Sequence, residues 1–450
     1  MYVDDRPIRY APPMERRSFF KTAGLALGAV PVLGAASLTL PPVAPRGRPG
    51  GPTDWTDVRD QFALTRSRIH MASFLLASHP RPVADAIERH RRGFDEDPVT
   101  YWEEHFMDAE FEVANAAGAY FGADPAHIGL TDSTTMGLGL VYGALKLAPG
   151  DEILTTPHDH YSTFEALNLR ADRTGAVVRR VPLYDDPAET SVDGVVGRLR
   201  AGLTDRTRVV AVTWVHSSTG VKLPIAAMAE ALREVNASRD AADRVLFCVD
   251  GVHGIGIDDV TMDGLGCDFF IAGTHKWVFG PRGTGMVVGR PEAWERLDFV
   301  IPSFGPHVAV WMGMLPPDTP YVTPGNRFTP GGFHSFEHRW ALGEAFRFHL
   351  DLGKARVQAR IHGLNSLAKE ALAEMPHVRL HTPRSPELSA GILCFEVDGH
   401  APQAVVDHLH HHGIVASTSP YRVSYARLAP SLINDEDEVA RSVAAIASLR

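Results

Sequence analysis

The chain has 450 residues, of which 44% are hydrophobic, which is enough for a large core and for two or three domains. Its formal net charge is −10, so we expect neither nucleic acid nor an anionic membrane surface as a partner. It contains three cysteines, and no Cys/His group has metal-ligand spacing, so the sequence predicts neither a disulfide framework nor a metal site.

The first 40 residues have the features of an export signal. Arg16 and Arg17 precede a weakly hydrophobic run rich in Gly and Ala, which is the pattern of a twin-arginine signal peptide. The alternative is a membrane anchor, because the run over 22–40 is nearly long enough to span a bilayer, but its glycines and Pro31 make it a poor helix. We therefore expect 1–40 to be cleaved near 35–37 without stable membrane insertion. The twin-arginine export machinery would deliver the folded protein to the periplasm or the extracellular space.

Residues 41–54 are rich in Pro and Gly and predict a flexible linker. From residue 55 onward, short apolar runs typical of buried strands alternate with helical patterns. This alternation predicts an α/β fold in which helices cover a mostly parallel sheet. The clearest strands are expected at 151–156, 208–214, 244–250 and 267–273, with helices over 110–122 and 223–235.

The pattern changes near residue 335. A long helix is expected over 335–353, followed by helix, strand and helix segments up to residue 450. We therefore predict a large domain over 55–334, including its N-terminal segment, and a smaller α/β domain over 335–450.

Polar residues follow several predicted strands, at the edge of a parallel sheet where functional groups gather. Ser133, Thr134 and Thr135 follow one strand and begin a helix, where hydroxyls and free N–H groups suit a phosphate; a simple helix cap is the alternative. His158 and His160 follow the next strand and are candidates for stacking on a flat ring, although a polar loop explains them equally well.

Two further strand ends carry an acid and an amine. Asp250 ends a buried run, and a buried carboxylate needs a cation, which is either an ion-pair partner or a protonated pyridine nitrogen. Lys276 follows the run that ends at residue 273; most lysines are surface residues, but one at a strand end loses its proton readily and attacks aldehydes. The phosphate turn, stacking residue, acid and lysine follow the order that pyridoxal 5′-phosphate (PLP) requires, so the sequence predicts PLP bound at Lys276.

Residues from about 65 to 448 resemble the class V aminotransferases, which are fold-type I PLP enzymes. The likeness is greatest to the isopenicillin N epimerase-like branch, with cysteine desulfurases as more distant relatives. It is carried, in family order and spacing, by DSTTMGL (132–138), HDHYST (158–163), SSTGVKLPI (217–225), VDGVHGIG (249–256), GTHKWVFGPRGTG (273–285) and TPGGFHSFEHRWAL (329–342). The resemblance implies a fold-type I PLP-dependent transferase fold and a homodimer with active sites at the subunit interface.

The resemblance also implies a role for each matched residue. Lys276 corresponds to the lysine that binds PLP, Asp250 to the partner of the pyridine nitrogen and His160 to the stacking residue, with His158 as the alternative register; we expect Lys276, Asp250 and His160 to be catalytic. Arg422, in PYRVSYA, corresponds to the arginine that pairs with a substrate carboxylate. The other expected cofactor contacts are His253 near the phenolic oxygen, the turn of Ser133, Thr134 and Thr135, and Ser217, Thr274, His275 and Gly332.

Two of these positions depart from the family pattern. Gly332 stands where many relatives have Thr, so a contact with the partner subunit's phosphate would have to use the backbone N–H. Ser217 stands where many relatives have Asn.

The resemblance implies an enzyme that acts at the α-carbon of an amino acid or an amino-acid-derived substrate, with epimerase-like or aminotransferase-type chemistry. A β-eliminating C–S lyase is the alternative. A desulfurase is disfavoured, because desulfurases carry a cysteine before this arginine region and residues 415–424 contain none. An exported protein that binds a ligand without catalysis is a third class, against which the set of Lys276, Asp250 and Arg422 argues. The long segment 303–328 could admit a bulky or peptide-like substrate.

Overall fold

The computed structural model describes residues 54–313, 316–318 and 323–449. The expected signal peptide and all but the last residue of the expected linker lie outside the described residues. Within the described part, no helix is long and apolar enough to cross a membrane.

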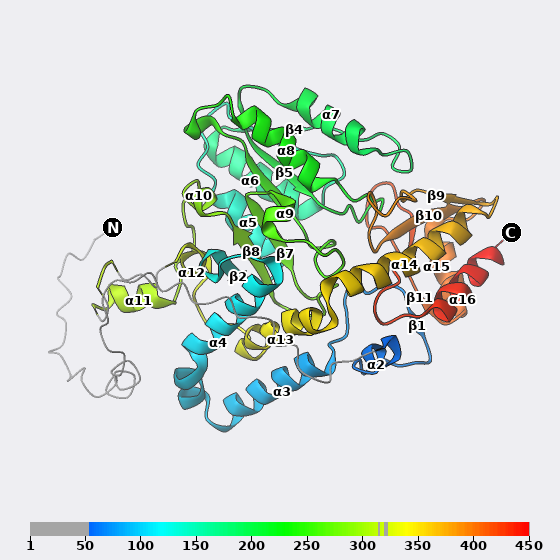
Figure 1. The fold of residues 1–450 in the computed structure, drawn as a ribbon, viewed down its shortest axis with the longest axis horizontal. Coiled ribbons are helices and arrows are strands. Elements are labelled where there is room, and N and C mark those ends of the chain that lie inside the picture. The colour runs from blue at the N-terminus through cyan, green and yellow to red at the C-terminus, as the bar shows by residue number, and fades with distance from the viewer. Residues whose placement is uncertain (1–53, 314–315, 319–322, 450) are drawn as a thin grey trace, which may run out of the picture.

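A seven-stranded sheet forms the centre of the large domain (Figure 1). Six of its strands run in the same direction, and β8 is antiparallel to both of its neighbours. The expected strands are confirmed to within two residues as β3, β5, β6 and β7. In spatial order the strands are β2 (Ile128–Thr131), β8 (Gly285–Gly289), β7 (Phe269–Gly273), β6 (Leu246–Asp250), β5 (Thr207–Thr213), β3 (Glu152–Thr155) and β4 (Val177–Arg180).

The central strands are continuous apolar runs because both faces of the sheet are covered. Every residue of β6, β7 and β8 is buried, as expected for strands between two layers of other structure. The edge strand β4 is more exposed and ends in Arg179 and Arg180. The helices that connect the strands are α5 (Thr134–Ala144), α6 (Tyr161–Thr174), α7 (Val192–Gly202), α8 (Ile225–Asn236) and α9 (Met262–Leu265), and a 3₁₀ turn at Ala241–Asp243 precedes β6.

Three long helices pack together beside this sheet: α3 (Arg81–Glu96), α4 (Pro98–Phe121) and α13 (Phe336–Leu352). The long helix expected over 335–353 is confirmed as α13, but its side chains Leu342 and Phe346 belong to the core of the large domain. Helix α13 therefore packs with α3 and α4 beside the large sheet, although we expected it to begin the small domain.

The small domain is built on a four-stranded antiparallel sheet with its own apolar core, in which Phe395, Leu409 and Ile446 are buried. The sheet order is β12 (Ser417–Thr418), β13 (Ala426–Leu428), β10 (Leu393–Val397) and β9 (Val378–Leu380). Three helices accompany it: α14 (Lys354–Ala373), α15 (Pro402–His411) and α16 (Glu436–Ala447).

The segment before α3 connects the two domains. Strand β1 (Ile69–His70) pairs with β11 (Ile414–Val415) of the small domain. A few residues later, the Ala77 N–H donates to the His275 carbonyl oxygen at 3.3 Å, beside Lys276. The same short segment therefore touches both the small domain and the loop that carries the predicted cofactor lysine.

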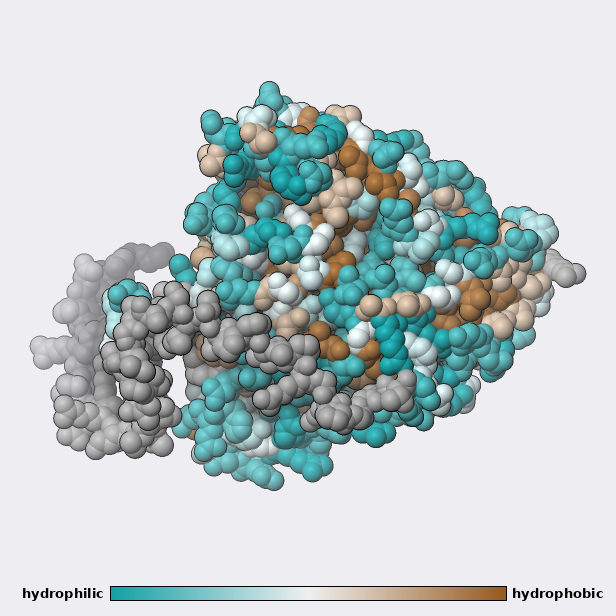
Figure 2. All heavy atoms as spheres, in the orientation of Figure 1, coloured by the Kyte–Doolittle hydropathy of each residue, from teal (hydrophilic) through white to brown (hydrophobic). Residues whose placement is uncertain are grey.

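The remaining elements are short. Figure 2 shows that hydrophilic residues cover most of this face of the molecule, with hydrophobic residues in patches between them. These short elements are α2 (Trp55–Arg59), a 3₁₀ turn at Pro125–His127, α10 (Pro291–Trp294), α11 (Pro306–Trp311) and α12 (Pro324–Phe328).

Candidate active site

Lys276 lies in a tight loop directly after β7. The loop is closed by a hydrogen bond of 2.8 Å from the Gly280 N–H to the Thr274 carbonyl oxygen. Within it, Phe279 is fully buried and has a left-handed backbone with φ of 57°, which side-chain-bearing residues rarely adopt. Such a conformation persists only where the surroundings enforce it, so the loop holds Lys276 in one place.

On balance, the surroundings of the Lys276 amine favour its neutral form. Its Nζ lies 3.2 Å from Nε2 of His253. Burial lowers the pKa of Lys276 to about 8; the charge of Asp250 opposes this shift, and that of Arg427 adds to it. A lysine with such a pKa offers an appreciable fraction of free amine near neutral pH, as a nucleophile or a general base requires.

Asp250 ends β6 and is 2% exposed. Among the described residues, the Val252 N–H is the sole hydrogen-bond donor to its side chain, at 3.1 Å. Burial raises the pKa of Asp250 to about 6, while the Val252 N–H and the Lys276 charge lower it. A buried carboxylate with so few partners can accept a further cationic donor, which is what a protonated ring nitrogen would provide.

The predicted anion turn is formed at the N-terminus of α5. Ser133 is the N-cap, and its Oγ accepts the Met136 N–H at 3.0 Å. The N–H groups of Thr134 and Thr135, in the first turn, have no partner within the helix and are free for an anion. Thr135 is exposed. The geometry therefore supports the phosphate interpretation of this turn.

The anion turn lies against the end of β7. The Thr134 hydroxyl oxygen accepts the Gly273 N–H at 2.8 Å. A Cβ on Gly273 would stand 2.8 Å from that hydroxyl and 3.2 Å from the His275 ring, so this close approach requires glycine. Burial lowers the pKa of His275 to about 4, so this ring is neutral at neutral pH and acts as a polar rather than a charged contact.

The structure distinguishes the two candidate stacking histidines. His158 stacks on Tyr184 at 4.1 Å with an angle of 9° between the rings. His160 caps α6 with its Nδ1, is exposed, and lies close enough to Lys276 for that charge to lower its pKa, after the larger effect of burial. His160 therefore lies within reach of the Lys276 charge, whereas His158 is half-buried and packs on Tyr184.

Two predicted cofactor contacts, Thr274 and Gly332, lie apart from the others. Thr274 is fully buried, and its hydroxyl pairs with the Thr284 hydroxyl at 2.6 Å, because the loop turns its side chain inward. Gly332 has a left-handed backbone with φ of 109° and lines a separate cavity. Thr274 therefore supports the lysine loop from within.

The small domain contributes the opposite side of the site. The hydroxyls of Tyr421 and Ser217 form a hydrogen bond of 2.6 Å, and the Tyr421 ring lies 6.4 Å from the His160 ring. Arg422, the expected carboxylate-binding residue, is exposed.

Arg427, which the sequence reasoning missed, is 2% exposed and lies near Lys276. Its guanidinium donates to the Ser217 carbonyl oxygen at 2.9 Å and stacks on the Phe74 ring at 4.4 Å. Its Nε is buried without a hydrogen-bond partner, and no carboxylate of the described residues lies within 4.0 Å of it. An arginine in the middle of the apolar strand ARL was the signal in the sequence.

Asp159, between the two histidines, was also missed. It is 1% exposed and accepts hydrogen bonds from the Thr155 and Thr156 hydroxyls and from the Thr156 and Thr213 N–H groups. It therefore joins the ends of β3 and β5 and fixes the turn that presents His160.

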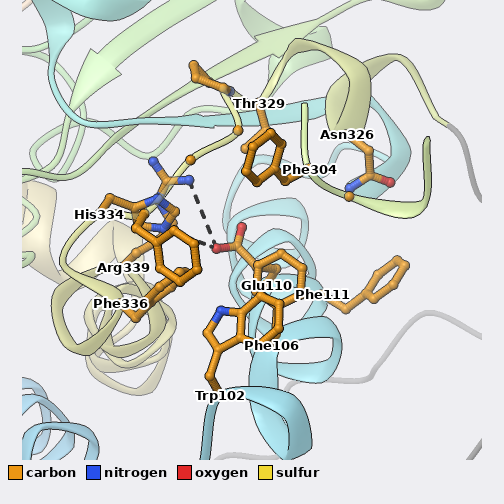
Figure 3. Close-up of a pocket in the computed structure, with 15 residues that line it drawn as sticks. Trp102, Phe106, Glu110, Phe111, Phe304, Asn326, Thr329, His334, Phe336 and Arg339 are labelled. Atoms are coloured by element: carbon orange, nitrogen blue, oxygen red, sulfur yellow. Dashed lines mark ion pairs between the residues drawn. The ribbon is translucent and has the colours of Figure 1, made fainter. Parts of the chain in front are cut away.

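A separate aromatic cavity lies beside the anion turn (Figure 3). Between its aromatic walls, the Glu110 carboxylate points toward His334 at 3.6 Å and Arg339 at 4.0 Å. Arg339 in turn donates to Asp132 at 2.6 Å, directly before Ser133. The lining also includes Gly331 and Gly332 of the TPGG motif and the aromatic residues Trp102, Phe106, Phe111, Phe304, Phe333 and Phe336.

Residues 98–424 match the family model for aminotransferase class-V. The chain belongs to this family. Its relatives include isopenicillin N epimerase of Streptomyces clavuligerus, 26% identical over 76% of this chain and 84% of the relative, and cysteine desulfurase of Dickeya dadantii, 29% identical over 74% and 79%. A solved structure of a C-DES mutant with glycine covalently linked to its PLP cofactor covers 87% of this chain and 99% of its own, with 22% identity and a TM-score of 0.78.

The expected fold is thereby confirmed as that of fold-type I PLP enzymes, and the chain is a PLP-dependent enzyme. The residues present fit this cofactor on their own geometry. Lys276 is a half-buried, readily deprotonated amine; Asp250 is a buried carboxylate with a single hydrogen-bond donor; and the turn at Ser133 presents free N–H groups toward the same sheet edge.

Proposed function

We propose that this enzyme removes the α-proton of an amino acid or an amino-acid-derived substrate, with Lys276 as both the cofactor lysine and the base. The observation that carries this proposal is the half-buried Lys276 amine, which lies 3.2 Å from His253 and whose pKa is lowered to about 8. When bound, PLP supplies a ring that withdraws electrons from the α-carbon.

Each of the other residues has a task that its surroundings support. Asp250 would keep the ring nitrogen protonated, because its buried carboxylate has one donor and needs a cation. The turn of Ser133, Thr134 and Thr135 would hold the phosphate, with His275 beside it. His160 would cover the ring face from the side of α6.

We propose Arg427, in place of Arg422, as the partner of the substrate carboxylate. Arg427 is buried beside Lys276 with one nitrogen unpaired, whereas Arg422 is exposed. The aromatic ring of Phe74 and three oxygen acceptors, on Ser217, Ser417 and Thr418, fix the direction of its guanidinium. A fixed guanidinium suits a carboxylate better than a mobile surface one, because less entropy is lost on binding.

For the reaction, we propose epimerase-like chemistry at the α-carbon, which returns a proton to the same carbon. A desulfurase would need an accessible thiolate, but all three cysteines are buried, and burial raises the pKa of Cys394 to about 12. A β-eliminating C–S lyase is the second candidate, because it needs no protein thiol and the relatives include cysteine desulfurases.

The decisive experiment follows α-proton exchange of amino acids and short peptides in heavy water by NMR. The wild type should exchange the α-proton of a true substrate, and Lys276→Ala should not. Chiral analysis then identifies an epimer, and assays for keto acid and released thiol identify transamination or elimination.

Borohydride reduction and peptide mapping test the site at which the cofactor is attached. A pyridoxyl label on any lysine other than Lys276 would contradict the proposal.

We also propose a homodimer. Phe333 is 80% exposed and Phe304 51% exposed at the rim of the aromatic cavity that contains the TPGG motif, and such exposed aromatic groups favour burial against another surface. Light scattering on the mature protein should give twice the chain mass. A fully active monomer would contradict this proposal.

We further propose export by the twin-arginine route, supported by Arg16-Arg17 and the Gly/Ala-rich run that follows. A reporter fused to residues 1–54 should be exported only by cells with that route. The double substitution Arg16→Lys and Arg17→Lys should retain the reporter in the cytoplasm, and unchanged export of this variant would contradict the proposal.

A further inference from the structure

His253 is held between two nitrogen atoms from consecutive residues. The Trp277 indole Nε1–H donates to its Nδ1 at 3.3 Å, and Lys276 Nζ lies 3.2 Å from its Nε2. All three residues lie just beyond β6 and β7, and Trp277 is fully buried while His253 is 5% exposed. The imidazole therefore has a defined partner on each nitrogen.

The partner on Nδ1 determines where the ring carries its proton. An indole N–H can only donate, so Nδ1 must accept and cannot carry a hydrogen. Burial lowers the pKa of His253 well below its usual range, so the ring is neutral; the Arg427 guanidinium acts in the same direction, as would positive charge on Lys276, His160 or His275. A neutral imidazole has one N–H, which is therefore on Nε2 and points at Lys276.

This arrangement affects the lysine. An ammonium group can only donate hydrogen bonds, so a protonated Lys276 would place N–H groups against the Nε2–H of His253. A neutral amine can accept that hydrogen bond. Asp250 acts in the opposite direction, because its negative charge favours the ammonium form, and the aromatic ring of Phe74, 6.4 Å from the His253 ring, adds no charge.

We propose that Trp277 is a positioning residue whose indole N–H locks His253 as the Nε2–H tautomer and thereby keeps Lys276 as a free amine, ready to react with the cofactor aldehyde. This inference deepens the proposed role of Lys276 and rests on it. The side chain that follows the lysine thus acts on the lysine through the histidine rather than by direct contact.

The tautomer can be measured directly in the full chain without cofactor. ¹⁵N-histidine labelling and NMR should show an unprotonated Nδ1 and a protonated Nε2 for His253, with its signals assigned from their loss in His253→Gln. A ring protonated at Nδ1, a mixture of tautomers or a charged ring at pH 7 would overturn the proposal. This measurement needs no change at Trp277.

The effect on Lys276 is tested with Trp277→Phe, which removes the indole N–H and keeps an aromatic ring. The reactivity of Lys276 toward an acylating reagent is followed against pH by mass spectrometry, again without cofactor. The midpoint should move to higher pH, and the reactivity at pH 7 should fall about fivefold to tenfold, as expected for the loss of one hydrogen bond that favours the neutral amine.

Trp294→Phe is the matched control. Trp294 is also buried in the large domain, and its indole N–H has no hydrogen-bond partner among the described residues. This variant should leave the Lys276 midpoint unchanged. A folded Trp277→Phe protein with an unchanged or lower midpoint would overturn the proposal. Because no cofactor is present, an error in the proposed PLP chemistry would leave both readouts intact.

Discussion

Two buried carboxylates at the same edge of the sheet differ in the number of hydrogen bonds that they accept. Asp159, after β3, accepts four hydrogen bonds from Thr155, Thr156 and Thr213, whereas Asp250, at the end of β6, accepts one. Both are almost fully buried. The hydrogen-bonding capacity of Asp159 is satisfied within the protein, and we call this residue the brace because it joins the ends of β3 and β5. The Asp250 carboxylate can still accept hydrogen bonds from a ligand. An incompletely bonded buried charge is thus the better marker of a binding site.

The largest expected effect is the loss of the brace. Asp159→Ala should lower the free energy of unfolding by about 2–5 kcal/mol, because it leaves the Thr156 and Thr213 N–H groups buried without an acceptor. Urea denaturation followed by circular dichroism measures this. Asp159→Asn keeps one acceptor oxygen and should lose about half as much; equal stability of all three proteins would refute the brace.

The next effect compares the two arginines of the small domain. Arg427→Lys and Arg427→Ala should each weaken the binding of an amino acid by about tenfold or more, the equivalent of roughly 1.5–3 kcal/mol for a charge-assisted hydrogen bond. Lys should be the milder change, because it keeps the charge without the planar fork. The readout is the change in cofactor absorbance on titration with a true substrate.

Arg422→Ala is the matched control for that experiment. Its side chain is exposed, and we expect a change in affinity of less than about twofold. If Arg422→Ala weakened binding and Arg427→Ala did not, the first sequence interpretation would stand and the buried arginine would have a structural role.

The third test concerns the incompletely bonded carboxylate and its pH dependence. The pKa of Asp250 is about 6 in the folded chain against 3.8 for an ordinary aspartate. Because the folded pKa is the higher one, the contribution of Asp250 to the free energy of unfolding is greatest below about pH 4. This contribution is lost as the pH rises through 6. Without cofactor, Asp250→Asn should therefore be more stable than wild type at pH 7, by about 1–3 kcal/mol, and this advantage should vanish near pH 4.

The Asp250→Asn protein should nevertheless lose activity with PLP, because a neutral amide cannot hold the ring nitrogen protonated. Thermal unfolding at pH 4 and pH 7, with proton exchange of a true substrate, measures both effects. A variant that is less stable at pH 7 would show that Asp250 is a second brace and not an acceptor for the cofactor.

The smallest effects distinguish the two histidines. His158→Ala should cost about 1 kcal/mol of stability, because it removes a stacked ring from Tyr184. His160→Ala should cost about 0.5–1 kcal/mol through loss of the α6 cap and, unlike His158→Ala, should also weaken PLP binding. Thermal melts with and without PLP separate these outcomes, and the reverse pattern would move the stacking role to His158.

The positions of the central strands and several residues at their ends were predictable from the sequence because they depend on local patterns. Apolar runs gave the strands, since β5, β6 and β7 are buried on both faces, and each polar residue that follows such a run must lie at the sheet edge. Lys276, Asp250 and the turn at Ser133 could be identified in this way because each directly follows or ends its own strand.

What the sequence could not determine depends on contacts between distant segments. The Thr274 hydroxyl turned inward because the loop closes on Thr284, and α13 joined the large domain because it packs on α3 and α4. The burial of Arg427 likewise depends on folding, because only the tertiary structure brings its guanidinium against the Ser217 carbonyl oxygen and the Phe74 ring. A pattern along the chain specifies what a residue follows, whereas burial and partners are set by the segments that fold against it.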